Sequence, residues 1–147
     1  MKYLLDSAPL AAYIRGRKGA VARFDALIRA QETATSILNY GEVIEGLHSF
    51  PSLYVQYQSI LRGLLQTQVT VLVPDYRTLE HYAEIRRTMR TLRTSTGQLV
   101  GLIGDIDTLI AATSLEHELT VVTTDTDYTR VPGLSVQLLT MAQLREP

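Results

Sequence analysis

The chain of 147 residues contains no cysteine and no tryptophan, and only two of its residues are phenylalanine. The absence of cysteine excludes disulfides, thiolate metal ligands and a cysteine nucleophile, and it fits a reducing cytoplasm. No run approaches the ~20 apolar residues that a membrane helix needs, so we expect a soluble protein without a membrane partner. The apolar run of residues 3–5 ends at once in Asp6, unlike the longer apolar segment of a secretory signal.

Several common catalytic patterns are also missing. The sequence has neither of the glycine-rich patterns that cradle phosphates, G-x-x-x-x-G-K-[ST] and G-x-G-x-x-G, and no G-x-S-x-G nucleophile elbow. The three histidines, His48, His81 and His117, lack metal-ligand spacing, and each lies in a helical stretch. We therefore assign no chemistry to them.

Charge is nearly balanced overall, at a formal −1, but it is unevenly distributed. Five arginines lie between Arg77 and Arg93, whereas residues 105–127 contain six acids and no lysine or arginine. A basic flank beside an acidic pocket suits a metal-dependent enzyme that acts on a phosphodiester, because the cations can hold the backbone and the carboxylates can hold the metal. The alternative is that the arginines form a solvated helix face.

Short strand-like runs alternate with helical stretches along the whole chain. Strands are predicted at 2–5, 33–38, 70–73, 120–124 and 134–138, and helices at 9–15, 20–30, 39–48, 53–66, 75–93 and 105–118. Ser7 is a possible N-cap of the first helix. This alternation predicts an α/β fold in one domain, residues 1–147: a three-layer α/β/α sandwich with a mainly parallel sheet of about five strands.

Four acids stand at boundaries between these elements: Asp6, Glu42, Asp107 and Asp125. In a parallel sheet the ligand crevice lies outside the carboxyl ends of the strands, where Asp6 and Asp125 are expected. Glu42 and Asp107 would come from the first turns of neighbouring helices. If the four converge, their repulsion favours a bound divalent cation. For any one of them, a role as a cap or in a turn is an equally good explanation.

Five segments together resemble one family. They are Tyr3-Leu4-Leu5-Asp6, the run S-I-L-N-Y-G-E at 36–42, I-G-D-I-D-T-L-I-A-A at 103–112, V-V-T-T-D at 121–125 and V-P-G-L at 131–134. Together they resemble a PIN domain, and most closely the VapC-type toxins of toxin–antitoxin pairs, over Met1 to about Leu139. The resemblance implies a Mg²⁺- or Mn²⁺-dependent endoribonuclease with one or two ions, which forms a homodimer and is silenced by an antitoxin.

The resemblance also implies roles for the four acids. Asp6 matches the first acid of the family, Glu42 the second, Asp107 the acid before the Leu-Ile-Ala-Ala helix, and Asp125 the position after the fourth strand. We expect all four to form the catalytic metal site. Asp6 and Asp107 would bind the metal directly, Asp125 directly or through water, and Glu42 as a ligand or as the general base.

Three further acids lie close to these in the sequence. Asp105 is expected as an N-cap, Asp127 as a water-bridged acid or part of a turn, and Glu45 on the surface or between subunits. Several polar residues could contact phosphate, a carboxylate or RNA, although packing is the more usual role for most of them: Ser7, Asn39, Tyr40, Thr123, Thr124 and Tyr128.

The helix expected at 53–66 carries an apolar stripe. It contains Tyr54, Tyr57, Ile60, Leu61, Leu64 and Leu65. With Phe50 and Leu53 it is a candidate contact for the antitoxin or a second copy, and the alternative is that it packs in the core. An antitoxin could insert an arginine among the acids, since guanidinium binds carboxylates in bidentate fashion.

Two other functions are compatible with an acidic α/β domain. One is a PIN-like binding module that has lost activity. The other is a phosphohydrolase of the haloacid dehalogenase type, but that enzyme needs a D-x-D motif after the first strand, and Asp6 is followed by Ser7 and Ala8.

Overall fold

Five parallel strands form the central sheet of the computed structural model, which describes all 147 residues. In chain order they are β1 (Tyr3–Leu5), β2 (Thr33–Ser36), β3 (Thr70–Leu72), β4 (Thr120–Thr123) and β5 (Val136–Leu138). The spatial order is β3-β2-β1-β4-β5, and every neighbouring pair is parallel. Strand order therefore reverses between β1 and β4, the place where open α/β sheets form a ligand crevice.

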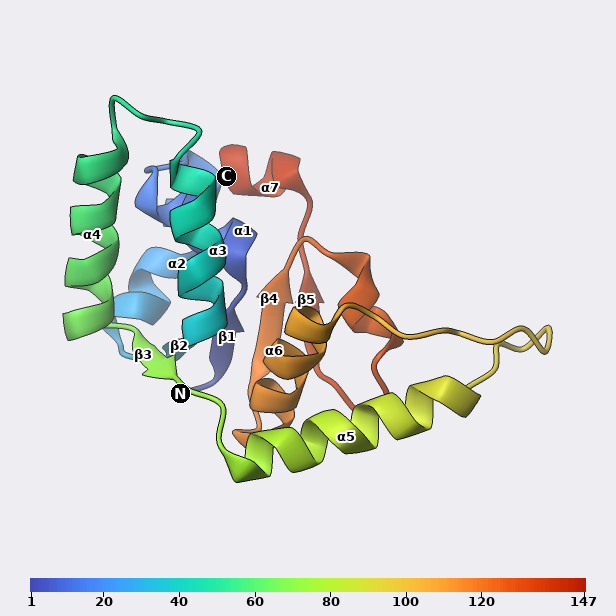
Figure 1. Cartoon of the computed structure of the whole chain (residues 1–147). Helices are drawn as coiled ribbons and strands as arrows, with labels where there is room; N and C mark the ends of the chain where they lie inside the picture. The colour runs from blue at the N-terminus through green and yellow to red at the C-terminus, as the bar shows by residue number, and fades with distance from the viewer.

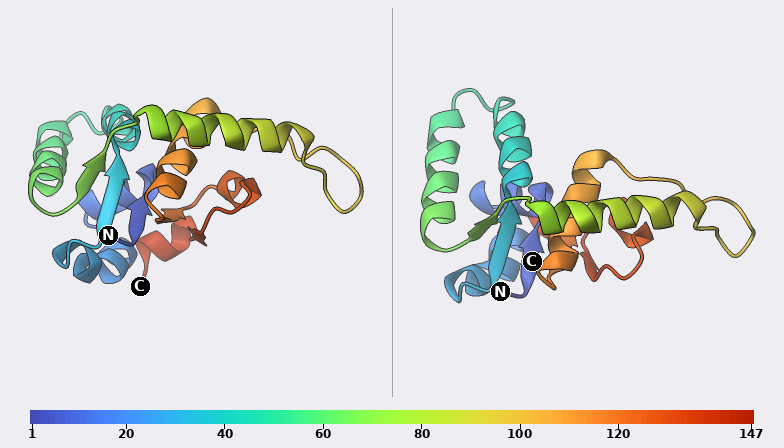
Figure 2. Two further views of the ribbon diagram at one scale, coloured as in Figure 1. Left: turned by 90° about the horizontal axis from the view of Figure 1, so that it is seen from below. Right: turned by 60° about the horizontal axis from the view of Figure 1, so that its bottom comes forward.

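Helices cover both faces of this sheet (Figures 1 and 2). One layer contains α1 (Ser7–Ile14), α2 (Lys18–Arg29), α3 (Ile37–Leu47), α4 (Tyr54–Thr67) and α7 (Met141–Arg145). The other contains α5 (Tyr76–Thr91), α6 (Asp105–Glu116) and the short 3₁₀ helix η1 (Thr126–Arg130). The predicted α/β/α sandwich is confirmed. In none of these helices is there a segment with the length and apolar character required to cross a membrane.

Alternation along the strands divides the core into two apolar clusters. Leu5 and Val122 belong to the cluster beneath α1, α2, α3, α4 and α7, whereas Leu4 and Val121 belong to the cluster beneath α5 and α6. Successive side chains of a strand point to opposite faces, so a short strand that packs on both sides carries apolar residues in succession, as Leu4-Leu5 and Val121-Val122 do. This requirement is why β1 and β4 were recognisable from the sequence.

The second strand is shorter than predicted. It ends at Ser36, and α3 begins at Ile37 rather than Asn39. The Ser36 hydroxyl accepts a hydrogen bond from the Leu38 backbone N–H (3.1 Å), and the Asn39 side chain accepts one from the Ser36 N–H (3.1 Å). This capping box outweighs the strand propensity of the β-branched Ile37. As a result, Glu42 lies in the second turn of α3 instead of the first.

Two predicted N-caps are wrong for a common reason. Ser7 is the first residue of α1, and the N-cap position belongs to Asp6, whose side chain makes no capping bond. Asp105 is the first residue of α6, after Gly104, and its carboxylate pairs with Arg86 (2.8 Å). In both cases a tertiary partner holds the side chain and competes with local capping.

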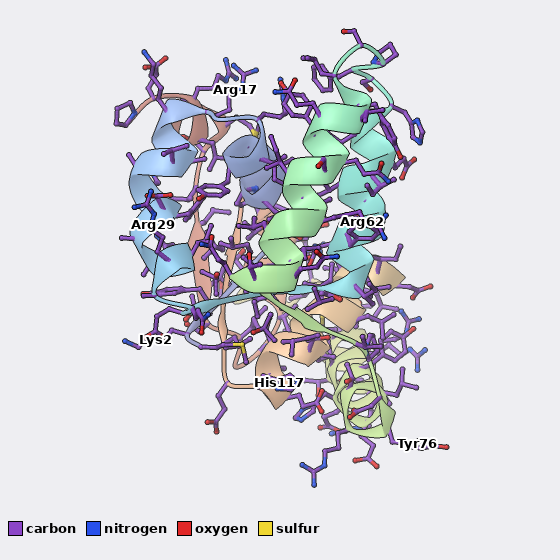
Figure 3. The ribbon with its side chains drawn as sticks, turned by 90° about the vertical axis from the view of Figure 1, so that its left-hand side faces the viewer. Lys2, Arg17, Arg29, Arg62, Tyr76 and His117 are labelled. Atoms are coloured by element: carbon purple, nitrogen blue, oxygen red, sulfur yellow. The ribbon has the colours of Figure 1, made fainter.

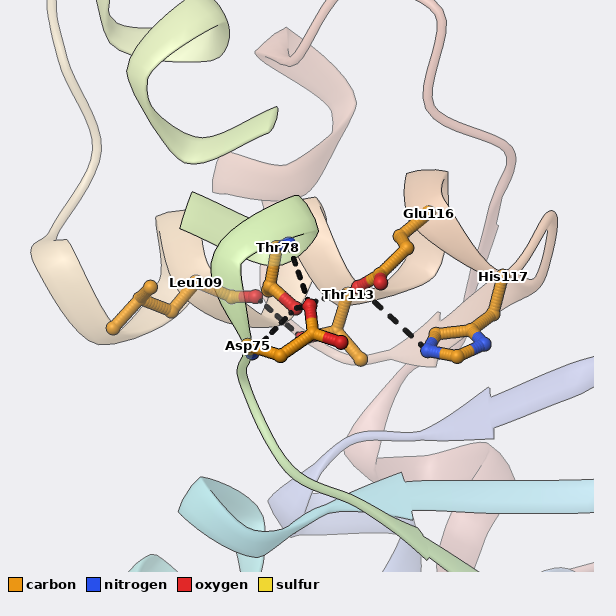
Figure 4. Close-up of polar contacts among 6 residues, drawn as sticks. All are labelled: Asp75, Thr78, Leu109, Thr113, Glu116 and His117. Atoms are coloured by element: carbon orange, nitrogen blue, oxygen red, sulfur yellow. Dashed lines mark hydrogen bonds and ion pairs between the residues drawn. The ribbon is translucent and has the colours of Figure 1, made fainter. Parts of the chain in front are cut away.

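Helix α5 and residues 92–104 form an arm that projects from the body of the protein (Figure 2). At its base the Thr78 hydroxyl donates to Glu116 Oε2 at the end of α6 (2.6 Å), and the Thr78 N–H donates to Asp75 (3.1 Å) (Figure 4). At its tip Arg93 donates to the Gly97 carbonyl (2.8 Å). The arm is therefore fixed to α6, the helix that carries Asp107.

The C-terminal helix α7, which the sequence patterns did not reveal, packs against the start of α2. A Cβ atom at Gly19 would lie 2.0 Å from the Gln143 carbonyl oxygen and 2.5 Å from that of Glu146. No side chain fits in this space. Gly19 therefore allows the two backbones to approach each other, and Leu144 becomes buried in the core.

We predict that Gly19→Ala lowers the free energy of unfolding by roughly 1–3 kcal/mol, because the added methyl group must displace α7. The matched control is Gly63→Ala in α4, where a Cβ would meet nothing within 4 Å. That variant should gain about 0.5–1 kcal/mol from better helix propensity. Urea unfolding followed by circular dichroism measures both, and equal stabilities for the two variants would contradict the described α2–α7 contact.

Candidate metal centre

The acids expected at strand ends lie around the point where strand order reverses. Asp6 directly follows β1, and Asp125 comes two residues after the end of the neighbouring β4. Asp107 lies in the first turn of α6, and Glu42 in the second turn of α3. Parallel strands end at the same edge of a sheet, so chain segments more than 100 residues apart meet here.

Asp6 is held most firmly. Its side chain is only 8% exposed and accepts hydrogen bonds from Asn39 Nδ2 (2.8 Å) and Thr123 Oγ1 (2.6 Å). A buried carboxylate is costly unless donors replace its water, and these two donors bind different oxygens of the group. The Thr123 hydroxyl also accepts from the Asp125 N–H (3.0 Å), which connects the first acid to the loop after β4.

Tyr128 lies between two of the acids. Its hydroxyl is 3.2 Å from Asp107 Oδ1 and 3.4 Å from Asp6 Oδ1, and its side chain is fully buried. Burial, and then the charges of Asp6 and Asp107, raise the pKa of Tyr128 far above its usual value, so it remains a protonated donor. Of the two tyrosines that the sequence left open as RNA contacts, Tyr128 is buried and binds the acids, and Tyr40 is half-buried against the core of the α1–α4 layer.

Glu42 is connected to Asp6 by two polar side chains. Its Oε1 accepts from the Ser7 hydroxyl (2.7 Å), and Ser7 accepts from Asn39 Nδ2 (3.0 Å). The fully buried Asn39 amide thus orients one acid directly and the other through Ser7. Glu42 Oε2 has no protein donor and is free to act on a ligand.

A second group of acids forms the opposite side of the site. Single carboxylate oxygens of Asp107, Asp125 and Asp127 all lie within 4.8 Å of one another. Asp127 also pairs with Arg130 (3.0 Å), and its N–H donates to Asp125 Oδ1 (2.9 Å). Oxygen ligands of Mg²⁺ or Ca²⁺ lie about 2.0–2.6 Å from the ion, so oxygens on opposite sides are roughly 4–5 Å apart. The three acids fit a divalent cation.

The pKa of Asp107 reflects its burial and the charges of the acids around it. The pKa is raised from 3.8 to about 6, chiefly by burial and then by the charges of Asp6, Asp125 and Glu42, against the lowering effect of the Tyr128 hydrogen bond. The other three predicted acids therefore lie close enough to Asp107 for their charges to act on it. A bound cation would remove this repulsion.

The neighbouring acids differ in their environments. Glu45 is exposed on α3, which agrees with its expected surface position. Asp105 is exposed and binds Arg86, and Tyr82 donates to it (3.2 Å). Asp127, for which the sequence left a role at the site or in a turn open, is one of the three clustered acids.

Packing was the more usual role expected from the sequence for Ser7, Asn39 and Thr123, but in the structure their side chains hold the acids in place. Each is polar in a segment that packs in the core: Ser7 follows Asp6, Thr123 ends β4, and Asn39 lies in the first turn of α3. Asn39 also stands three residues after Ser36, the spacing of a capping box. That spacing was the available signal, and it locates the start of α3 as well.

The fold and site define a class: α/β domains with clustered carboxylates at the carboxyl edge of a parallel sheet. The sequence model of the family described as PIN domain matches residues 3–134. The chain belongs to the PIN domain family. No curated protein matches the chain in sequence.

Solved structures share this fold. VapBC2 from Rickettsia felis, bound to a DNA fragment from its promoter, is similar with a TM-score of 0.74 and 21% identity, covering 94% of this chain and 98% of the other. DNA-bound VapBC from Salmonella typhimurium has a TM-score of 0.73 and 22% identity over 93% and 97%. VapBC-1 from nontypeable Haemophilus influenzae has a TM-score of 0.66 and 25% identity over 94% and 98%.

We predict that Asp107→Asn stabilises the metal-free protein at pH 7.5 by about 1–2 kcal/mol, since a half-buried charge is removed and partial exposure screens it. The acid binds its proton more tightly when folded, so its ionisation destabilises the fold increasingly as pH rises from about 4 to about 6. The gain should therefore shrink at pH 5 and vanish below pH 4.

Thermal unfolding in EDTA and in Mn²⁺ measures this effect. Mn²⁺ should raise the Tm of the parent but not of Asp107→Asn. Asp105→Asn, two residues earlier and exposed, is the control: it should keep the Mn²⁺ response and lose at most ~1 kcal/mol with its ion pair. A parent that is more stable than Asp107→Asn at pH 7.5 in EDTA would show that the acids do not repel one another.

Proposed function

We propose that the chain is the toxin of a type II toxin–antitoxin pair and a Mg²⁺- or Mn²⁺-dependent endoribonuclease that hydrolyses RNA phosphodiester bonds in the cytoplasm. The observation that carries the proposal is the cluster of carboxylate oxygens from Asp107, Asp125 and Asp127, all within 4.8 Å of one another, in a chain of the PIN domain family. A centre that concentrates negative charge in this way suits a site that works with a cation and a phosphate.

The proposed roles of the acids, metal binding and proton acceptance, fall on two sides of the centre. Asp107, Asp125 and Asp127 are close enough to hold one ion, and Asp6 lies across the Tyr128 hydroxyl, where it could share that ion or hold a second. A bound Mg²⁺ or Mn²⁺ would supply an acidified water and polarise a phosphate oxygen. Glu42 Oε2, which has no protein donor, is suited to accept the proton of the attacking water.

The arm is the proposed contact for the RNA backbone. Arg86 is neutralised by Asp105 and Arg87 by Glu84, whereas Arg90 and Arg93 are exposed and form no ion pair. The arm is connected to the centre through Arg130. That side chain donates to the Val100 carbonyl on the arm (2.9 Å) and to Asp127 at the centre (3.0 Å). Unpaired arginines on an arm that is attached to the acidic site can position the RNA backbone beside the acids.

The proposed partners are a cognate antitoxin and a second copy of the chain. The expected apolar stripe on α4 is mainly core, because Leu61 and Leu64 are buried, although Leu53 and Ile60 remain 37% and 42% exposed. A groove between α1 and α3 is lined mostly by apolar residues and reaches Ser7 and Glu42. An antitoxin segment in this groove could present an arginine to the acids. Co-purification with the neighbouring gene product and sedimentation analysis test both partners.

The other two functions gain no support from the site. The complete set of clustered acids argues against an inactive binding module. The second aspartate of a D-x-D phosphohydrolase motif would stand two residues after Asp6, where this chain has Ala8.

We expect Asp6→Asn to lower RNA cleavage by about 100-fold or more, because it removes a charge on which the metal centre depends. Expression of the parent and the variant, followed by mapping of new RNA 5′ ends, measures this loss and identifies the target. Glu45→Gln removes the same charge from the exposed face of α3 and should cleave like the parent. Equal patterns of RNA ends for the parent and Asp6→Asn, with Mn²⁺ binding intact in calorimetry, would refute the nuclease.

A further inference from the structure

A cationic hollow lies at the end of α1 that is remote from the metal centre. It has a volume of about 440 Å³ and is lined by four basic side chains from two separate parts of the chain: Arg15, Arg17, Lys18 and Arg145. Arg15, Arg17 and Lys18 come from the α1–α2 connection and the start of α2, and Arg145 ends α7. Glu146 is the one acid in its lining.

None of these four cations is neutralised within the protein. They take part in no ion pair, whereas Arg29, Arg86, Arg87 and Arg130 elsewhere on the surface each have an acidic partner. Arg17 and Lys18, at the start of α2, line the hollow, and this helix end has no side-chain cap and no acidic residue. The positive end of the twelve-residue helix adds to the attraction for an anion.

Arg15 connects this hollow to the metal centre. Its guanidinium carbon lies 4.2 Å from the centre of the Phe50 ring, and its buried Nε has no hydrogen-bond partner. Arg15 also lines the groove between α1 and α3, which contains Ser7 and Glu42 at its other end. The eight residues of α1 span about 12 Å, so the hollow and the acids lie at the two ends of one continuous surface.

We propose that the cationic hollow binds a backbone phosphate of the RNA substrate, at a nucleotide removed from the bond that is cut. This inference rests on the proposed function and adds a substrate-positioning site to it. The acids at the centre repel a polyanion unless cations nearby attract it, and the arm supplies such cations on one side only. The hollow supplies them at the other end of the α1 groove, where guanidinium groups can grip phosphate oxygens in pairs.

The test is binding of a fluorescently labelled single-stranded RNA in EDTA, where no metal-dependent cleavage occurs, followed by anisotropy at several KCl concentrations. Arg17→Gln/Lys18→Gln should weaken binding roughly tenfold or more at 50 mM salt, and the slope of log K against log salt should become shallower by about 1.4, or 0.7 for each lost phosphate contact. Arg145→Gln, on a different helix, should show half of that change in slope.

The matched control is Lys2→Gln/Arg62→Gln, which removes the same charge from two exposed side chains that belong to neither the arm nor the hollow. Figure 3 shows Arg62 on α4, well separated from Arg17. This variant should bind RNA within twofold of the parent. If the control and Arg17→Gln/Lys18→Gln lose equal RNA affinity, the effect comes from net charge alone, and the inference is overturned.

Cleavage kinetics separate this inference from the proposed function. If the parent cleaves RNA in Mn²⁺, the hollow variants should raise KM with little change in kcat, because they touch only a remote part of the substrate. If the hollow variants cleave RNA with the KM of the parent, the nuclease proposal holds and the hollow is not an RNA site. Loss of RNA binding by the hollow variants, in a parent that cleaves nothing, would support the hollow and reject the nuclease. Tighter binding of a labelled polyglutamate peptide than of RNA would assign the hollow to an acidic protein and reject the inference.

Discussion

The burial of the Asp6 carboxylate is the constraint on which the rest of the site depends. A buried charge is stable only if donors replace its water, and here the donors come from α3 and β4. Asn39 and Thr123 therefore tie the start of α1 to two other elements. Through Ser7 and Tyr128 the same network reaches Glu42 and Asp107. One carboxylate thus fixes the relative positions of four segments of the chain.

The same arrangement makes the metal-free centre unfavourable. Asp107 is held among other acids with its pKa raised to about 6, so at neutral pH the fold bears the cost of an ionised group that it partly desolvates. The protein offsets this cost elsewhere, through two apolar clusters on opposite faces of a parallel sheet. Electrostatic repulsion of this kind is typical of functional sites, where the protein loses stability and gains affinity for a ligand of opposite charge.

The distribution of cations follows a similar logic. Arginines next to the acids are mostly paired: Arg130 with Asp127 and Arg86 with Asp105. Unpaired cations lie farther out, on the arm and at the remote end of α1. An RNA strand bound both by the arm and by the hollow would cross the acidic centre between them. A metal ion bound at that centre would neutralise the acids and so remove their repulsion of the RNA phosphates.

The sequence by itself determined the sheet, its buried strands and the four acids at strand and helix ends. Short strand-like runs that alternate with helical periods allow few other folds, and the acids stand out because a core strand excludes them. The partner of Asp105, the burial of Tyr128 and the membership of Asp127 in the acidic cluster were decided only by tertiary structure. These depend on which groups meet across distances of 20 to 120 residues, and a hydrogen bond or ion pair between such groups overrides local propensity without leaving a periodic pattern in the sequence.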